Sequence, residues 1–223
     1  ESIILDDAFQ HRYLLADLNI LLTTYKRPFF TDYLLPVGRL REGRRNVNRA
    51  DLIVVTKCPD TLDLNEKNRF RKQISDYLVR EKPIYFAGLK YGSPYPLNLG
   101  FSEPGDKFIL VTGIVDPEPI RLHLEGKQKV VMETIAFPDH HSYKAKDMLR
   151  ISEVYKKYAT KNVSILTTEK DAVKLKDNKL LELVSNIPVF VLPVEIDMEQ
   201  KEEEQLLKRI KSMIINKNAN GEI

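Results

Sequence analysis

The chain has little cysteine, no long apolar run and a small net charge. It has one cysteine, Cys58, among 223 residues, which excludes an internal disulfide framework and fits a reducing compartment. No run of about 18 apolar residues occurs, so no segment is expected to span a membrane, and no signal peptide is visible. The net charge of +3 gives no argument for nucleic acid, although it is compatible with an anionic surface.

A further absence concerns nucleotide binding. The chain does not contain Gly-x-x-x-x-Gly-Lys-Ser/Thr, the loop whose backbone amides cradle phosphates. What is present is the composition of a folded chain of one large or two small domains, with 43% apolar and 30% charged residues.

Apolar runs alternate with amphipathic segments, which predicts an α/β chain with mostly parallel sheets covered by helices. The expected strands cover residues 3–5, 18–23, 51–56, 83–89, 107–112, 129–135, 163–166 and 188–194. The expected helices cover residues 63–80, 117–125, 146–158, 169–185 and 199–215.

The domain boundary is expected where proline and glycine concentrate, over residues 91–106. This predicts a first α/β unit over residues 1–95, a linker over 96–106, a second α/β unit over 107–198, and a terminal helix with a frayed tail over 199–223.

Two carboxylates, Asp6 and Asp7, follow the expected strand 3–5. Open α/β sheets bind ligands at the carboxyl ends of their strands. In P-loop NTPases an apolar strand that ends in Asp holds the magnesium ion of the nucleotide. The alternative is an ordinary turn or helix cap. Gln10 and His11 would line the same site if a helix begins here.

A long loop over residues 25–49 shows no clear period and is rich in arginine. Arginine binds phosphate oxygens in pairs, so the loop suits a phosphate or an anionic surface. Arg44 and Arg45 are the candidate membrane contacts. The alternative is a solvated basic loop.

Four stretches in a fixed order are more specific. They are Asp-Asp-Ala-Phe-Gln-His at 6–11, Leu-Pro-Val-Gly-Arg-Leu-Arg-Glu at 35–42, Phe-Pro-Asp-His-His at 137–141 and Thr-Glu-Lys-Asp-Ala-Val-Lys at 168–174. Over residues 1 to about 195 the chain resembles the bacterial tetraacyldisaccharide 4'-kinases, the lipid A 4'-kinases. Ala8 stands where that family usually has Gly, which suggests that the backbone there does not need positive φ.

The resemblance implies a partial P-loop-NTPase-like sheet plus a second, smaller α/β domain. It implies transfer of the γ-phosphate of ATP, with Mg²⁺, to the 4'-hydroxyl of tetraacyldisaccharide 1-phosphate, a lipid A precursor. The site would face the cytoplasmic side of the bacterial inner membrane, with peripheral attachment. The family carries its phosphate loop upstream, so we expect this chain to be a carboxy-terminal portion that is inactive alone.

The resemblance also assigns roles. Asp6 is expected to hold magnesium, Asp7 and His140 to act in catalysis, and a further set to bind substrate or phosphate: Gln10, His11, Arg41, Glu42, Lys170 and Asp171. From the residues alone, Thr168 and the acids after it also fit a helix cap. A zinc site at His140 and His141 is disfavoured because adjacent residues rarely chelate one metal.

Other classes stay open at this point. A different P-loop small-molecule kinase or a nucleotide-dependent switch could share the sheet, and a catalytically silent binding protein could keep the fold. The arginine-rich loop and the Asp-His pair at 139–140 favour the lipid kinase. Lys57, at the end of the strand 51–56, is expected at the edge of the site.

Overall fold

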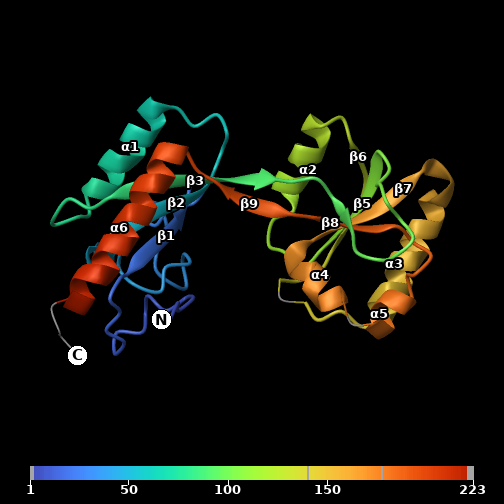
Figure 1. Ribbon diagram of the computed structural model, residues 1–223, viewed down its shortest axis with the longest axis horizontal. Coiled ribbons are helices and arrows are strands. Elements are labelled where there is room, and N and C mark those ends of the chain that lie inside the picture. Colours follow the sequence, from blue (N-terminus) through green and yellow to red (C-terminus); the bar gives the residue numbers. More distant parts are fainter. Residues whose placement is uncertain (1–2, 140, 177, 220–223) are drawn as a thin grey trace. The chain divides into compact units, whose positions relative to one another are not determined.

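The computed structural model describes residues 3–139, 141–176 and 178–219. The chain forms two compact units, residues 1–89 with 196–223 (unit 1) and residues 90–195 (unit 2) (Figure 1). It passes from one unit to the other within β3 (Ile84–Tyr91) and within β9 (Val194–Asp197). Among the described helices, none combines the length and the apolar character needed to cross a bilayer.

Unit 1 is built on a four-stranded sheet in the order β1-β2-β3-β9. The strands β1 (Ile20–Thr24), β2 (Leu52–Cys58) and β3 run parallel. One apolar cluster joins α1 (Leu64–Ser75), a 3₁₀ helix (Arg44–Arg49) and the buried rings of Phe29 and Phe30. A second cluster packs the sheet against Leu206 and Ile210 of α6 (Gln200–Ala219). The loop over residues 25–49 is therefore partly core and not merely solvated.

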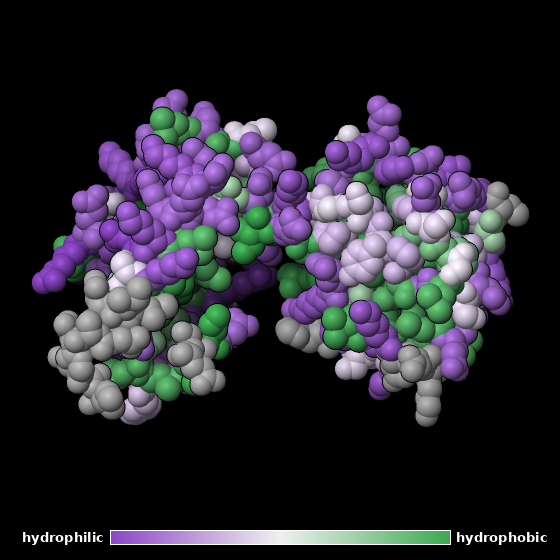
Figure 2. Space-filling view, viewed as in Figure 1, coloured by the Kyte–Doolittle hydropathy of each residue, from purple (hydrophilic) through white to green (hydrophobic). Residues whose placement is uncertain are grey.

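The carboxylate of Glu202 fixes α6 to unit 1. It lies 3.3 Å from Lys67 Nζ and 3.1 Å from Arg71 Nη2, both on α1, and accepts a hydrogen bond from the Phe86 N–H of β3 at 3.1 Å. Hydrophilic side chains accordingly gather over α1 and α6 in Figure 2. The terminal helix, expected as a separate segment, belongs to the first unit.

The helix α1 ends at Ser75, before the limit of 80 that its apolar spacing predicts. The side chain of Asn48 explains the difference, because it donates to the carbonyl of Tyr77 at 2.9 Å and accepts from the N–H of Val79 at 2.8 Å. These bonds replace those of a further helical turn. Tyr77 still packs against the core, as its spacing indicates.

Unit 2 is built on a five-stranded sheet in the order β4-β8-β7-β5-β6. The strands β5 (Lys107–Thr112), β6 (Val130–Ala136), β7 (Val163–Thr168) and β8 (Val189–Leu192) are parallel, and β4 (Tyr95–Pro96) is antiparallel to β8. The helices are α2 (Glu118–Gly126), α3 (Ala145–Tyr158), α4 (Glu169–Leu175) and α5 (Asn178–Glu182).

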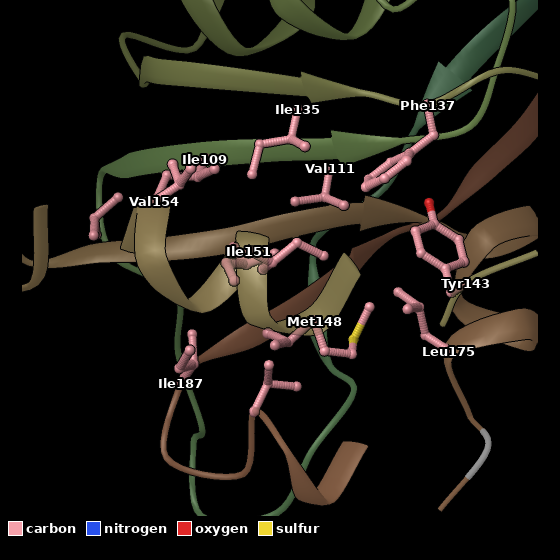
Figure 3. Close-up of a cluster of buried hydrophobic side chains, with 14 residues drawn as sticks. Ile109, Val111, Ile135, Phe137, Tyr143, Met148, Ile151, Val154, Leu175 and Ile187 are labelled. Carbon is pink, nitrogen blue, oxygen red and sulfur yellow. The ribbon is translucent and has the colours of Figure 1, made fainter. Parts of the chain in front are cut away.

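Helices cover both faces of this sheet. The side chains of α2, including Ile120 and Leu124, pack on Phe108 and Leu110 of β5. Side chains of α3 and α4 pack on the other face, with Phe137 and Tyr143 at the end of the cluster where the strands end (Figure 3). The neighbouring strands β5 and β7 are thus followed by helices on opposite faces of the sheet, α2 after β5 and α4 after β7. That arrangement is a topological switch point, where open α/β sheets bind ligands.

The prediction of an α/β chain with mostly parallel sheets is confirmed. The predicted strand over 3–5 is wrong: Ile3 and Ile4 are 88% and 93% exposed, and these residues have no regular structure. A strand needs a hydrogen-bonding neighbour, and no described strand pairs with this run. The boundary also differs, because β4 pairs with β8 and Leu97 packs in the unit 2 core, so residues 96–106 belong to unit 2.

Candidate functional site

In unit 1 the first and second motif stretches meet. Arg41 Nη2 forms an ion pair with Asp7 Oδ1, although the two residues are far apart in the sequence. Asp7 has a φ of 50°, while Ala8 is not in the left-handed region, as its departure from glycine suggests. A non-glycine residue at positive φ is uncommon and marks candidate sites. Asp6, beside it, is exposed.

A second carboxylate extends this group. Glu42 lies between two guanidinium groups, since one oxygen is 3.3 Å from Arg12 Nη2 and also pairs with Arg49. The guanidinium of Arg49 lies 4.4 Å from the ring centre of Phe9, which adds a cation–π contact. We call Asp7, Arg12, Arg41, Glu42 and Arg49 the arginine cluster. Its three cations face two carboxylates, so it carries an excess positive charge that suits an anion.

A cavity of about 80 Å³ adjoins the arginine cluster and is lined by Phe9, Gln10, Arg41 and Glu42, among others. Gln10 Oε1 and Arg49 Nε are buried without a hydrogen-bond partner among the described residues. Buried polar atoms are nearly always paired, so these two atoms indicate a place for a ligand group or water. His11 is exposed, and its N–H donates to the Ala8 carbonyl at 2.9 Å in a turn instead of the expected helix.

A larger open hollow of about 730 Å³ lies along residues 32–45. Its wall includes Tyr33, Leu35 and Val37, which are 63%, 60% and 83% exposed. Arg44 holds the loop together, because its Nε and Nη2 donate to the Asp32 carbonyl at 2.9 and 2.7 Å. The expected membrane contact at Arg44 is therefore corrected: its guanidinium is used inside the loop.

Lys57 lies at the carboxyl end of β2, where the register with β3 shifts. It is exposed and has a φ of 55°. A non-glycine residue at positive φ is uncommon, so Lys57 stays a candidate for the edge of the site.

In unit 2 the third and fourth motif stretches meet. Lys170 Nζ lies 2.7 Å from Asp139 Oδ1. His141 stacks on Phe137 with ring centres 4.6 Å apart, and its Nε2 lies 2.9 Å from Asp147 Oδ2. His140, the expected catalytic histidine, lies outside the described residues.

Asp171 differs from its expected role in substrate binding. Its side chain is fully buried, and Oδ2 accepts hydrogen bonds from the Gly113 N–H at 2.9 Å and from Thr168 Oγ1 at 2.8 Å. Thr168 in turn caps α4 by accepting from the N–H of Asp171, as its sequence position suggests. The geometry offers a structural contact within unit 2 and no exposed carboxylate for a substrate.

Four residues that contact motif residues in the two units have no signal of their own in the sequence. Arg12, Arg49, Gly113 and Tyr143 lie outside the four motif stretches, and only the fold brings them to the motif residues. Among the described residues, no group of three or more His, Cys, Asp or Glu side chains could hold a metal ion.

Asp147 supplies a stability prediction. Burial raises the pKa of its carboxyl, but hydrogen bonds from His141 and from the Lys144 N–H lower it more, so the net pKa is lowered. A lowered pKa stabilises the fold above the unfolded pKa, and this contribution is lost as the pH falls through the folded pKa. Asp147→Ala should therefore cost about 1–3 kcal/mol at pH 7. Urea titrations at several pH values measure the free energy of unfolding of the wild type and of the variant. The difference between the two should shrink below about pH 4, near the ordinary aspartate pKa. A cost that does not change with pH would contradict the assignment.

Comparison with known proteins gives one family. The sequence profile described as Tetraacyldisaccharide-1-P 4'-kinase (LpxK) matches residues 1–211. A curated tetraacyldisaccharide 4'-kinase of Bacteroides fragilis is 34% identical over 233 residues, covering 100% of this chain and 61% of the relative. One of Phocaeicola vulgatus is 35% identical over 228 residues, covering 99% of this chain and 62% of the relative. The chain thus spans about three fifths of the length of these relatives.

A solved structure is also similar. It is the "apo" form of LpxK from Aquifex aeolicus in complex with ATP, with a TM-score of 0.58 and 27% identity. The match covers 93% of this chain and 56% of that one.

Proposed function

The chain belongs to the LpxK family of tetraacyldisaccharide-1-P 4'-kinases, and on that premise we propose that it serves ATP-dependent phosphorylation of the 4'-hydroxyl of a tetraacyldisaccharide 1-phosphate. One observation carries the proposal: the arginine cluster joins two motif stretches through Asp7 and Arg41 and borders a cavity with unpaired polar atoms. The excess of guanidinium groups over carboxylates in this cluster suits a nucleotide phosphate or a sugar phosphate. The solved relative, which is in complex with ATP, supports a nucleotide as one of the ligands.

The residues present fit magnesium by their chemistry. Mg²⁺ prefers hard oxygen ligands and usually takes one or two protein carboxylates besides phosphates and water. Asp6 is exposed and can offer its carboxylate, whereas Asp7 is already paired with Arg41. Asp6 would therefore hold the ion, which would neutralise charge on the ATP phosphates.

The acceptor hydroxyl must lose a proton as its oxygen bonds to the γ-phosphorus and the bond to the β–γ bridging oxygen breaks. We assign His140 to this proton transfer as the partner of a carboxylate, because imidazole titrates near neutral pH. Asp139, the residue before His140 in the sequence, pairs with Lys170 of the fourth motif stretch. Arg41 and Gln10 are assigned to phosphate or acceptor positioning. The chain lacks a phosphate loop, so the phosphate cradle is not among these residues.

The experiment is acceptor-dependent ADP formation by the intact gene product. We expect ADP only when ATP, magnesium and the tetraacyldisaccharide 1-phosphate are all present. ADP formation with a small-molecule acceptor, and none with the lipid, would favour a different kinase of the same fold. Nucleotide binding without transfer to any acceptor would favour a switch or a silent binding protein.

The hollow along residues 32–45 is proposed as the contact with an anionic lipid surface, at the cytoplasmic face of the inner membrane. Exposed apolar side chains line the hollow together with the exposed Arg45, and the exposed Arg39 lies in the same loop. Apolar and basic side chains together hold peripheral proteins on anionic bilayers. Each basic residue near such a surface contributes about 1 kcal/mol, so reversing both charges should weaken binding at least about tenfold.

Vesicle sedimentation with phosphatidylglycerol at low and high salt measures this effect. Arg39→Glu with Arg45→Glu should lose most binding at low salt and less at high salt, because salt screens exposed charges. Arg80→Glu with Lys127→Glu removes the same charge from exposed positions elsewhere and serves as the control. Equal loss in both double variants would show a net-charge effect and not a lipid contact at this hollow.

A further inference from the structure

The loop at residues 33–37 exposes large apolar side chains one after another. Tyr33, Leu34, Leu35 and Val37 are 63%, 51%, 60% and 83% exposed. The side chain of Leu40, beyond them, is half-buried and packs against the unit 1 core. Single exposed apolar residues are common on protein surfaces, but a contiguous group of them marks a place where a partner or a ligand binds. This group therefore indicates a binding site in unit 1.

Backbone hydrogen bonds fix the shape of this loop. The Leu40 N–H donates to the Tyr33 carbonyl at 2.9 Å, and the Leu40 carbonyl accepts from the Leu35 N–H at 3.0 Å. The Gly38 N–H donates to the Leu34 carbonyl at 3.0 Å. Gly38 also lies so close to the Tyr33 carbonyl that a Cβ at this position would overlap it. Because the loop closes on itself, the site is formed before a ligand arrives, and binding does not carry the cost of ordering the loop.

The start of the loop is bonded to the 3₁₀ helix that follows it. Arg44 donates to the Asp32 carbonyl through two of its nitrogens, and its guanidinium lies 5.3 Å from the ring centre of Tyr33. The Asp32 carboxylate accepts hydrogen bonds from the N–H groups of Tyr33 and Arg39 at 2.8 and 3.3 Å. The polar groups of Asp32 and Arg44 are thus bonded within unit 1, which leaves the apolar side chains as the main surface for a ligand.

The hollow beside this loop is large and mostly apolar. Its volume of about 730 Å³ lies within the range of about 300–1,000 Å³ that ligand pockets occupy. Arg45 lines it too, is exposed, and has no partner for its guanidinium among the described residues. A cation without a partner beside an apolar wall suits an amphiphile with an anionic group. The apolar and aromatic lining residues are Tyr33, Leu34, Leu35, Val37 and Leu40.

An alkyl chain fits this wall better than a peptide does. A peptide carries backbone N–H and C=O groups, and these groups need partners when they are covered. The N–H groups of Leu35, Gly38 and Leu40 already donate within the loop, so they are not available to pair with a bound backbone. An alkyl chain has no polar group and needs no such partner.

We propose that the hollow along residues 32–45 binds one acyl chain of the acceptor lipid, with Arg45 beside an anionic group of the same molecule. This rests on the proposed function, in which the acceptor is a tetraacyldisaccharide 1-phosphate, and it adds a site for one part of that acceptor. A chain site differs from contact with a lipid surface, because it binds single amphiphile molecules where no bilayer is present.

Isothermal titration calorimetry of the intact gene product with alkyl phosphates, kept below the concentrations at which they form micelles, measures this binding. We expect octyl, decyl and dodecyl phosphate to bind at one molecule per protein. Each added methylene should tighten binding about twofold to fourfold, because a methylene that leaves water completely gains about fourfold. An affinity that does not rise with chain length would overturn the proposal.

The charge of the head group tests the part assigned to Arg45. Dodecyltrimethylammonium has the same chain as dodecyl phosphate but a cationic head, so it should bind more weakly. Equal affinity for the two amphiphiles would overturn the pairing of Arg45 with an anionic group.

Two double variants locate the site. Leu35→Asn with Val37→Asn makes the wall polar without changing the charge. Leu64→Asn with Val79→Asn makes the same two changes at positions of unit 1 that are 68% and 84% exposed and lie outside the hollow. All four side chains are exposed, so both variants should fold, which thermal unfolding checks. The first should bind dodecyl phosphate at least about tenfold more weakly and the second as the wild type does. Equal affinities of the two double variants would overturn the proposal.

The acceptor itself identifies the source of the chain. Tetraacyldisaccharide 1-phosphate should displace dodecyl phosphate, and Leu35→Asn with Val37→Asn should raise the KM for this acceptor while the KM for ATP stays unchanged. Displacement by phosphatidylglycerol but not by the acceptor would overturn the proposal in favour of a membrane lipid. If the intact gene product transfers no phosphate, the proposed function fails, while the titration with alkyl phosphates still decides whether the hollow binds a chain.

Discussion

Asp6→Asn in the intact gene product should lower kcat by roughly 10²-fold or more while the protein stays folded. The substitution keeps the size of the side chain but removes one charge from the ligand that we assign to magnesium. Stabilisation by a bound metal ion is worth several kcal/mol in a phosphoryl transfer, and each 1.36 kcal/mol is tenfold in rate. Asp6 is exposed, so the loss should not come from unfolding.

The measurement is the rate of ADP formation as a function of magnesium concentration. The variant should need more magnesium to reach half of its own reduced maximum. Asp60→Asn, another exposed aspartate of unit 1, should behave as the wild type. Wild-type turnover of Asp6→Asn at saturating magnesium would contradict the assignment of Asp6 as the magnesium ligand.

His140→Ala should lower kcat by roughly 10²–10⁴-fold, the range for the loss of a general acid–base group. The affinity for ATP should change less, because the proton transfer concerns the acceptor hydroxyl. The pH dependence of kcat should also change. The limb of the profile that depends on the lost acid–base group should be missing in the variant.

His123→Gln is the control for this prediction. His123 lies on α2 and packs against the ring of Tyr91 with centres 4.7 Å apart, outside the four motif stretches. It should leave both kcat and the pH profile unchanged. If His140→Ala keeps the wild-type pH profile at any level of kcat, the assigned proton transfer is wrong.

The sequence predicts most of the fold because the signals are local. Buried strands such as Lys107–Thr112 read as continuous apolar runs, and the structure confirms this strand at the predicted limits. The run Ile3–Leu5 carries the same signal, yet it forms no strand, because a strand also needs a neighbour that a local pattern does not supply. The early end of α1 has a similar origin, since Asn48 lies outside the helix that it ends.

The sequence likewise predicts only part of the candidate site. The motifs single out Asp7 and Arg41 as separate candidates, and the structure joins them in an ion pair. The sequence does not distinguish a residue that touches a ligand from one that holds the fold. Asp171 and Arg44 both stand in stretches expected to bind, yet the carboxylate of one is fully buried and the guanidinium of the other is bonded to the Asp32 carbonyl. That distinction depends on burial and partners, which only the three-dimensional arrangement sets.

The most direct measurement of the central claim is the position of the transferred phosphate. The intact gene product is incubated with ATP labelled at the γ-phosphate and with the tetraacyldisaccharide 1-phosphate, and the product is mapped by mass spectrometry and phosphorus NMR. The account predicts that the label appears on the 4'-oxygen and that an acceptor without the 4'-hydroxyl takes up none. Label on any other position, or transfer that persists with the 4'-deoxy acceptor, would contradict it.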